Sequence, residues 1–311
     1  MAITAAMVKE LREMTGAGMM DCKKALNETN GNMDEAVEYL RKNGQAKAEK
    51  KAGRIAAEGL CKVVTDGDKT AAVVEVNSET DFVAKNAEFQ NYVTAVAEQA
   101  LATTATDIDT FLAEAWKADA SKTVKDALVE KIAVIGENLS IRRFEKIVEE
   151  NGCVVTYTHG GGRIGVIVDA DTDVVNDTVK EAMHNIAMQI AALNPKYVSR
   201  DEVSADYIAH EKEILLAQIM NDPKESQKPE KVINGMIEGR ISKELKEVCL
   251  VDQVYVKAED GKQTVAKYLE EVSKAVGGTV KVKRFVRFET GEGLEKKQED
   301  FAAEVAAQMN A

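Results

Sequence analysis

Hydrophobic residues in the first fifty positions recur at the spacing of amphipathic helices. Asn32 followed by Glu35 is typical of a capping box, while Gly31 and Gly44 are expected to end the second and third helices. The pattern predicts a three-helix module within residues 1–54. Its three apolar faces are formed by Met7, Val8, Leu11 and Met14, by Cys22, Ala25 and Leu26, and by Met33, Ala36, Val37 and Leu40.

A different, strand-like pattern begins at Gly59. Two short runs at residues 60–64 and 71–76 are joined by a turn and followed by an amphipathic helix. The same order of hairpin and helix recurs from Gly152. We infer an internal duplication that gives two antiparallel sheets, each packed on helices. The apolar positions of the two helices are Phe89, Val93, Val96 and Leu101 in the first unit, and Val179, Met183, Ile186, Ile190 and Leu193 in the second.

Two charged helices follow Pro195, and the turn between them contains Pro223 and Pro229. This spacing predicts an antiparallel helical hairpin. Strand character returns at residues 254–256 and 280–288, and these strands are expected to complete the second sheet. The helical hairpin is therefore interpreted as an insertion into the second unit.

The end of the chain carries a narrow apolar stripe formed by Leu294, Phe301, Val305 and Met309. The stripe predicts a C-terminal helix that docks either on a partner or on the protein's own core. The overall prediction is an α+β fold. Its expected parts are the module at 1–54, a first core unit at 55–140, a second core unit at 141–198 and 251–290, the helical hairpin at 199–250, and a C-terminal helical module at 291–311.

Charge argues against nucleic acid as the main partner. The 311 residues include 53 acids and 41 bases, and the net charge of -12 repels phosphate. One basic stretch, residues 41–54, holds six bases and one acid and is expected to be a solvated linker or a helix extension. RNA binding through this stretch is an alternative that the lack of interleaved aromatic residues disfavours. A protein partner is the stronger expectation.

The cysteines and the N-terminus favour a cytoplasmic protein. Cys22, Cys61, Cys153 and Cys249 lie far apart, without a Cys-x-x-Cys pair or histidines at ligand spacing, which predicts free thiols and no metal site. The N-terminus lacks a basic start followed by an apolar run, and no stretch of about 18 apolar residues occurs. We therefore expect neither a targeting segment nor a membrane anchor.

Catalytic chemistry is not indicated by any motif. The sequence lacks a Gly-x-x-x-x-Gly-Lys-Ser/Thr phosphate cradle, and the glycines at 16–18 and 160–162 are typical of turns. His159, His184 and His210 have no serine or cysteine nucleophile beside them in the sequence, although pairing in space stays open. No cofactor and no direct nucleotide binding are expected.

A strand gives way to a helix at Thr80, Asp81, Phe82 and Val83. The junction combines an acid with a large apolar ring. One interpretation is structural: Thr80 or Asp81 caps the helix, and Phe82 folds back as a hydrophobic staple. The second unit reads Ala-Asp-Thr-Asp-Val at the equivalent residues 170–174, so the duplicated fold does not require a phenylalanine there. The other interpretation is that the ring reaches outward to a partner.

Three segments carry a resemblance to a known family. Residues 80–86 read Thr-Asp-Phe-Val-Ala-Lys-Asn, residues 15–26 read Thr-Gly-Ala-Gly-Met-Met-Asp-Cys-Lys-Lys-Ala-Leu, and residues 136–143 read Gly-Glu-Asn-Leu-Ser-Ile-Arg-Arg. Together they resemble the elongation factor Ts family, the bacterial-type guanine nucleotide exchange factors for elongation factor Tu. The resemblance runs from the first helix to the last. The third segment is explained by a helix stop before a strand and is assigned no direct role.

The resemblance implies a ubiquitin-associated-like (UBA-like) N-terminal module and a factor that acts by binding, without covalent chemistry. It implies elongation factor Tu, GDP-bound or nucleotide-free, as the partner, with residues 80–83 entering its nucleotide domain beside a magnesium ion. Displacing that ion or its water removes a large attraction for phosphate, so GDP leaves faster. The competing class is a scaffold protein in which the Phe82 junction is merely a cap.

The resemblance also implies further partner contacts. They involve Leu11, Met19 and Met20 in the N-terminal module, His159 at the second hairpin tip, and Leu294 and Phe301 in the C-terminal module. From the residues alone, methionines pack cores as readily as interfaces, and a hairpin-tip histidine is often an ordinary turn residue. The turn at His159 is one glycine longer than the usual form of the family. The family further suggests a homodimer through the helical hairpin, whose apolar rows could equally be satisfied within it.

Overall fold

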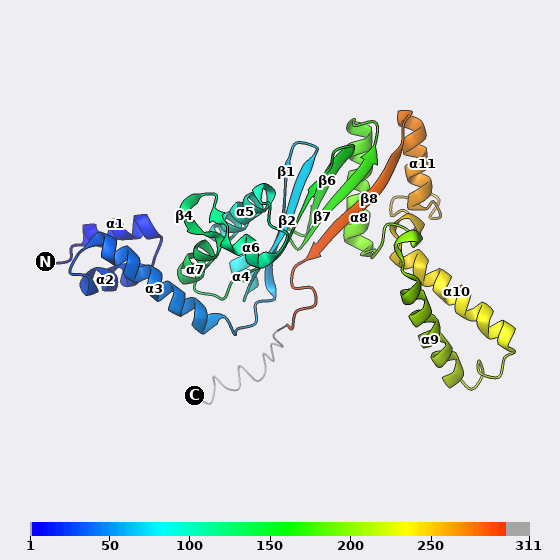
Figure 1. Cartoon of the computed structure of the whole chain (residues 1–311), viewed down its shortest axis with the longest axis horizontal. Helices are drawn as coiled ribbons and strands as arrows, with labels where there is room; N and C mark the ends of the chain where they lie inside the picture. The colour runs from blue at the N-terminus through cyan, green and yellow to red at the C-terminus, as the bar shows by residue number, and fades with distance from the viewer. Residues whose placement is uncertain (1, 297–311) are drawn as a thin grey trace.

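The computed structural model describes residues 2–296. The molecule is elongated, with the N-terminal helices at one end, two sheets in the middle and the helical hairpin at the other end (Figure 1). Helices and antiparallel sheets occur together, so the predicted α+β class is confirmed. Most of the predicted C-terminal helix lies outside the described residues, and residues 291–296 contain no helix.

The N-terminal module consists of α1 (Ala5–Thr15), α2 (Met19–Glu28) and α3 (Met33–Lys51). Asn32 caps α3 by accepting hydrogen bonds from two backbone N–H groups of its first turn. The three predicted apolar faces meet in one small core. Its buried members are Val8, Leu11, Cys22, Ala25, Leu26 and Ala36.

Helix α3 runs beyond the glycine that was expected to end it. The expectation for Gly44 is wrong, because α3 continues to Lys51. Gly44 packs on α7 (Val124–Ile135), and a Cβ atom at this position would lie 3.5 Å from the Cβ atom of Ala133. Gly44 therefore lies within the contact between the two helices, where a Cβ atom would make an ordinary van der Waals contact. Most of the basic stretch at residues 41–54 is a helix extension, one of the two interpretations offered for it.

The first sheet has the strand order β1–β2–β5, with β1 (Glu58–Asp66), β2 (Thr70–Ser78) and β5 (Ser140–Val148) all antiparallel. Because β5 pairs with β2, residues 141–148 belong to the first sheet, and their predicted place in the second core unit is wrong. Strands joined by a long connection leave no local pattern that reveals their pairing.

Helices cover the first sheet and fill its core. After β2 come α4 (Asp81–Ala84) and α5 (Ala87–Ala102), the predicted unit helix. Three short elements that the sequence did not suggest lie between α5 and α7: α6 (Ile108–Ala113), β3 (Ala115–Trp116) and β4 (Asp119–Thr123). The core joins Val74 and Val76 of β2 to Phe89, Val93 and Val96 of α5 and to Phe111, Trp116, Val124 and Ile132.

The second sheet has the order β6–β7–β8, with β6 (Gly152–His159), β7 (Ile164–Thr172) and β8 (Val280–Glu289). It packs on α8 (Asp177–Leu193) and α11 (Val265–Val276), so the predicted repeat of hairpin and helix is present. The expectation of a strand at 254–256 is wrong. Within the described chain, only an isolated bridge joins Val254 to Thr264, because the neighbouring residues form turns rather than a ladder.

The helical hairpin is formed by α9 (Ala205–Asn221) and α10 (Glu230–Val248), and short 3₁₀ turns at Arg200–Glu202 and Leu250–Asp252 flank it. Its apolar rows are buried between the two helices, which matches the interpretation that they are satisfied within the hairpin. The buried members include Ile219, Ile233, Ile237, Ile241 and Leu245.

The two sheets pack against each other through a third, smaller core. Gly165 on β7 allows the close approach, because a Cβ atom there would lie 3.1 Å from Val73 and 3.3 Å from Cys61. The backbone N–H of Cys61 also donates to the carbonyl of Gly162 across 2.7 Å. The buried residues of this core are Cys61, Ala71, Val73, Ile147, Val154, Ile167 and Phe288. The first unit is thereby held to the second.

Two buried carboxyl groups lie at this junction of the sheets. Asp169 of β7 accepts a hydrogen bond from Arg284 (3.0 Å), and Glu149 accepts one from Lys283 (2.6 Å). Burial raises the pKa of Asp169, whereas the hydrogen bond from Lys283 lowers the pKa of Glu149 to about 2. Oδ1 of Asp169 has no hydrogen-bond donor among the described residues unless it shares a proton with Glu149.

We expect Asp169→Asn to stabilise the protein at neutral and alkaline pH. A buried acid with a raised pKa costs folding free energy as the pH rises from its unfolded pKa, near 4, through its folded pKa. An amide avoids this charge and donates to Glu149, so the gain should reach about 1 kcal/mol at about pH 8 and vanish near pH 4. Urea unfolding at the two pH values measures it. Asp171→Asn, exposed on the same strand, is the matched control, and a loss of stability at pH 8 would contradict the shared proton.

Candidate functional site

The 80–83 turn links β2 to α5 and presents an aromatic ring to solvent. The Thr80 hydroxyl caps the single-turn helix α4 by accepting a hydrogen bond from the backbone N–H of Val83 (3.3 Å). Phe82 is 81% exposed, so the staple interpretation is wrong for its side chain. Val83 takes the inward position and packs on the first core. The cap part of that interpretation is confirmed for Thr80, and the ring is left free to contact a partner.

Asp81 stands beside the ring as a charged, half-exposed group. Its carboxylate accepts a hydrogen bond from Lys85 (2.6 Å), one helical turn further on. This hydrogen bond lowers the pKa of Asp81, so the carboxylate carries its negative charge throughout the neutral range. The turn therefore offers a ring and an anion on adjacent residues.

An open recess of about 850 Å³ borders the 80–83 turn. Its apolar lining includes the side chains of Phe82 and Ile55, and Ile55 is 41% exposed. Lys296, at the end of the described chain, also lines it, so the segment after β8 returns to the first unit. The recess is lined by Arg54, Ile55, Ala57, Glu58, Glu79, Thr80, Asp81, Phe82 and Lys296.

Sequence reasoning missed the residue that supports this turn. Glu137 follows α7 and directs its carboxylate at the backbone of the turn: Oε2 accepts from the N–H groups of Glu79 and Thr80, both at 3.1 Å. Its Oε1 accepts from the Thr80 hydroxyl at 2.6 Å. Glu137 falls within the family signature at residues 136–143, but that pattern does not distinguish a supporting glutamate from a solvated one.

The N-terminal module presents exposed methionines but buries its leucine. Met19 and Met20, at the start of α2, are 57% and 75% exposed, so both side chains reach solvent. Leu11 is fully buried in the module core. A direct partner contact by Leu11 is therefore not supported, because its side chain is buried in the core that α1 forms with α2 and α3.

His159 is exposed at the end of β6 and accepts or donates one hydrogen bond, with the Tyr157 hydroxyl, at 2.9 Å. The glycines after it all have positive φ angles, and a Cβ atom at Gly162 would lie 2.8 Å from the Leu60 side chain. The long glycine turn is thus packed against β1. The part of β1 that it contacts pairs with the end of β2, which leads into the 80–83 turn, and Arg163 of the glycine turn lies 3.9 Å from Glu58 at the start of β1.

The C-terminal candidates are only partly within the described residues. Leu294 is half-buried in the segment that follows β8. Phe301 lies outside the described residues. The start of this segment is held by the buried Glu75, which accepts a hydrogen bond from the backbone N–H of Gly291 at 2.8 Å.

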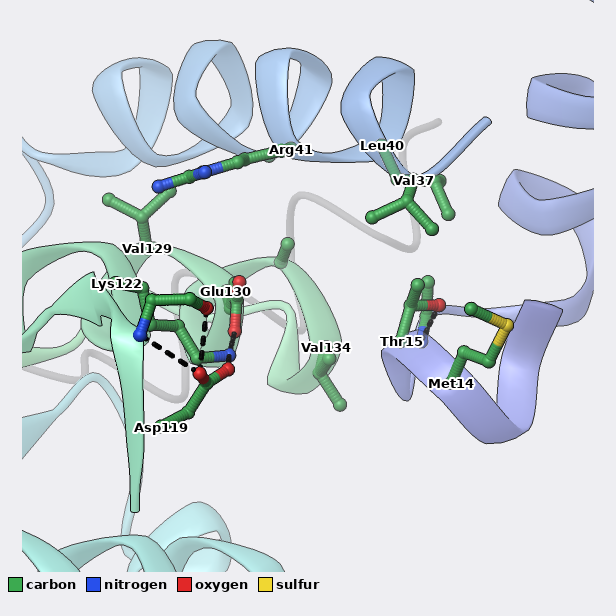
Figure 2. A pocket seen from close by; sticks show the side chains of 14 residues that line it. Met14, Thr15, Val37, Leu40, Arg41, Asp119, Lys122, Val129, Glu130 and Val134 are labelled. Carbon is green, nitrogen blue, oxygen red and sulfur yellow. Dashed lines mark hydrogen bonds and ion pairs between the residues drawn. The ribbon is translucent and has the colours of Figure 1, made fainter. Parts of the chain in front are cut away.

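A second recess of about 310 Å³ lies between α1, α3 and α7. Val37 and Leu40 of α3 and Val129 and Val134 of α7 are among the side chains that line it (Figure 2). Lys122 forms ion pairs with Asp119 and Glu130 at its edge. None of the predicted site residues within 2–296 lines this recess, which lies between the N-terminal module and the first core unit.

The remaining chemistry is sparse. Among residues 2–296, no cluster of three or more metal-ligating side chains was found, and the four cysteines are buried free thiols. Over the same range, no helix is both long and apolar enough to cross a membrane.

An exposed aromatic ring on a supported turn and exposed methionines on a separate module are features typical of proteins that act by binding other proteins. Comparison with known proteins identifies its family. The model of the family described as Elongation factor TS matches residues 79–292. The chain is 53% identical over 308 residues to elongation factor Ts of Clostridioides difficile (strain 630), and 50% identical over 308 residues to that of Clostridium tetani (strain Massachusetts / E88).

Each of these alignments covers 99% of both chains. A similar relative, elongation factor Ts of Clostridium novyi (strain NT), is 50% identical over 309 residues. The chain therefore belongs to the elongation factor Ts family and is a translation elongation factor by that membership.

Proposed function

We propose that the protein binds elongation factor Tu and promotes the release of GDP and its exchange for GTP. The observation that carries this proposal is Phe82, which is 81% exposed on the supported 80–83 turn with the Asp81 carboxylate beside it. A soluble domain gains nothing in stability from holding a large ring in water. A partner that covers the ring removes its apolar surface from water, and this burial favours binding.

The mechanism proposed for this site is displacement without covalent chemistry. The Phe82 ring enters the partner's nucleotide domain as a wedge. The Asp81 carboxylate repels the phosphate oxygens of GDP and competes with the ligands of the partner's magnesium ion. Magnesium bridges protein and phosphates, so disturbing the ion weakens the hold on GDP. An exchange factor binds the nucleotide-free partner more tightly than the nucleotide-bound one, and GTP later displaces the factor by the same coupling.

Further contacts extend the proposed interface. Met19 and Met20 offer adaptable apolar surface for a helix of the partner's nucleotide domain. His159 is proposed to reach another domain of the partner. Leu294 and Phe301 are proposed to dock near the N-terminal module. A homodimer through the helical hairpin stays a weaker proposal, since α9 and α10 already bury their apolar rows against each other.

The direct test is the release of a fluorescent GDP analogue from elongation factor Tu, with excess unlabelled GDP and with or without this protein. We expect release to accelerate with protein concentration and to saturate. An unchanged release rate, with complex formation still seen by sedimentation, would leave the scaffold function as the better account.

RNA binding through residues 41–54 is weakened as an alternative by the contacts of the bases. Arg41 pairs with Asp126, Lys47 with Asp21, and Arg54 with Glu79. These cations connect elements of the protein itself, so less positive charge is left to attract phosphate.

A further inference from the structure

The segment that follows α7 holds the 80–83 turn through one carboxylate. Glu137 is half-buried and receives three hydrogen bonds from Glu79 and Thr80, two of them from backbone N–H groups. A helix of one turn has too few internal hydrogen bonds to be stable alone. The shape of α4 (Asp81–Ala84) therefore depends on its neighbours, and Glu137 is the neighbour that satisfies the backbone just before it.

A second set of contacts runs in the opposite direction and closes a clamp. The Glu79 carboxylate accepts from the backbone N–H of Asn138 (2.6 Å), so the strand end and the helix exit each bind the backbone of the other. Arg54 lies 3.4 Å from Glu79, and its carbonyl accepts from the Asn138 side chain (2.8 Å). The clamp thus joins the 80–83 turn to the residues that follow α3.

Helix α3 connects this clamp to the N-terminal module along α7. The Arg41 guanidinium pairs with Asp126 in the first turn of α7 (3.0 Å), and Lys51 donates to the carbonyl of Gly136 at its end. Between these points Gly44 packs on Ala133. The two helices lie side by side with the 310 Å³ recess at the module end (Figure 2). Module and turn are therefore attached to the same helix, α7.

From these contacts we infer that Glu137 is a positioning residue that presents Phe82 and Asp81 to the partner in a fixed orientation relative to the N-terminal module. The inference rests on the proposed exchange function and specifies how its site is held. Glu137 touches neither the partner's ion nor its nucleotide; it acts through the 80–83 turn. Preorganisation of the 80–83 turn lowers the entropic cost of inserting the ring. Loss of this preorganisation should therefore slow GDP release more than it weakens binding to the partner.

Amide hydrogen exchange on the free, full-length protein tests the structural half of the inference. Glu137→Ala should make the amides of residues 79–84 exchange about tenfold faster, because two backbone N–H groups lose their acceptor. The junction between β7 and α8 in the second unit, residues 173–176, should not change. Glu98→Ala, exposed on α5, is the control for removing a glutamate. Unchanged exchange at residues 79–84 in Glu137→Ala overturns the inference, whatever the protein's activity.

A double-mutant cycle on GDP release tests the functional half. Glu137→Ala should lower the saturating release rate about tenfold and change the half-saturating concentration less than twofold. In a Phe82→Ala background the same substitution should have less than a twofold effect, because it acts through the ring. Glu137→Gln keeps an acceptor for the two N–H groups and should restore most of the rate.

An equally large loss in both backgrounds would overturn the inference, since it would show a general defect in folding or binding. A GDP release rate with Glu137→Ala that lies within twofold of the wild-type rate would also overturn the inference. If the wild-type protein fails to accelerate release, the proposed function falls, and the hydrogen-exchange result still decides whether Glu137 holds the turn.

Discussion

Phe82→Ala is expected to remove most of the acceleration of GDP release while leaving the fold intact. The ring is 81% exposed, so its truncation should change the free energy of unfolding by no more than about 0.5 kcal/mol. Coupling between two ligands of one protein is typically about 1–3 kcal/mol, so loss of the wedge should slow saturated release by about tenfold or more. Stopped-flow release of a fluorescent GDP analogue from elongation factor Tu measures the effect.

The matched control comes from the duplication. Val175 is 43% exposed between β7 and α8, the place in the second unit that corresponds to the 80–83 turn. With the Val175→Ala variant, elongation factor Tu should release GDP as fast as it does with the wild-type protein. Asp81→Asn separates the anion from the ring: full acceleration in that variant, with loss in Phe82→Ala, assigns the effect to the wedge. Full acceleration in Phe82→Ala itself would contradict the role proposed for the ring.

The sequence predicted those elements whose evidence is local. Amphipathic spacing identified the helices of the N-terminal module, the two unit helices and the helical hairpin, because each buries one continuous face. It predicted the wrong role for Gly44, since a glycine that ends a helix and a glycine inside a helix look alike in one chain. The strand expected at 254–256 had the right composition but lacked a neighbouring strand to pair with.

The candidate site was predicted as a set of residues, but its support was not. The exposure of Phe82 could be suspected because the second unit lacks a ring there. The role of Glu137 could not be suspected, because it depends on contacts with Glu79 and Thr80, which precede it by 58 and 57 positions in the sequence. A glutamate after a helix stop is indistinguishable in sequence from a solvated one, and only the fold places it under the turn.

The environment of Glu75 is also hidden in the sequence. Of the substitutions proposed here, Glu75→Ala should cause the largest loss in the free energy of unfolding. Its fully buried carboxylate accepts hydrogen bonds from Arg142 (3.0 Å), Arg143 (2.6 Å) and the backbone N–H of Gly291 (2.8 Å). Removing one partner of a buried ion pair typically costs about 3–5 kcal/mol. Both arginines keep some contact with water, so we expect a loss near 3 kcal/mol in urea unfolding.

Two further variants separate charge from packing at this position. Glu75→Gln keeps the shape and one acceptor oxygen but removes the charge, so its loss should fall between those of the wild-type and Glu75→Ala proteins. Glu145→Ala, exposed on β5, should change stability by less than about 0.5 kcal/mol. A loss below about 1 kcal/mol in Glu75→Ala would show that water solvates both arginines once the carboxylate is gone. Because Glu75 also binds Gly291, the same variant should loosen the segment that leads back to the 80–83 turn.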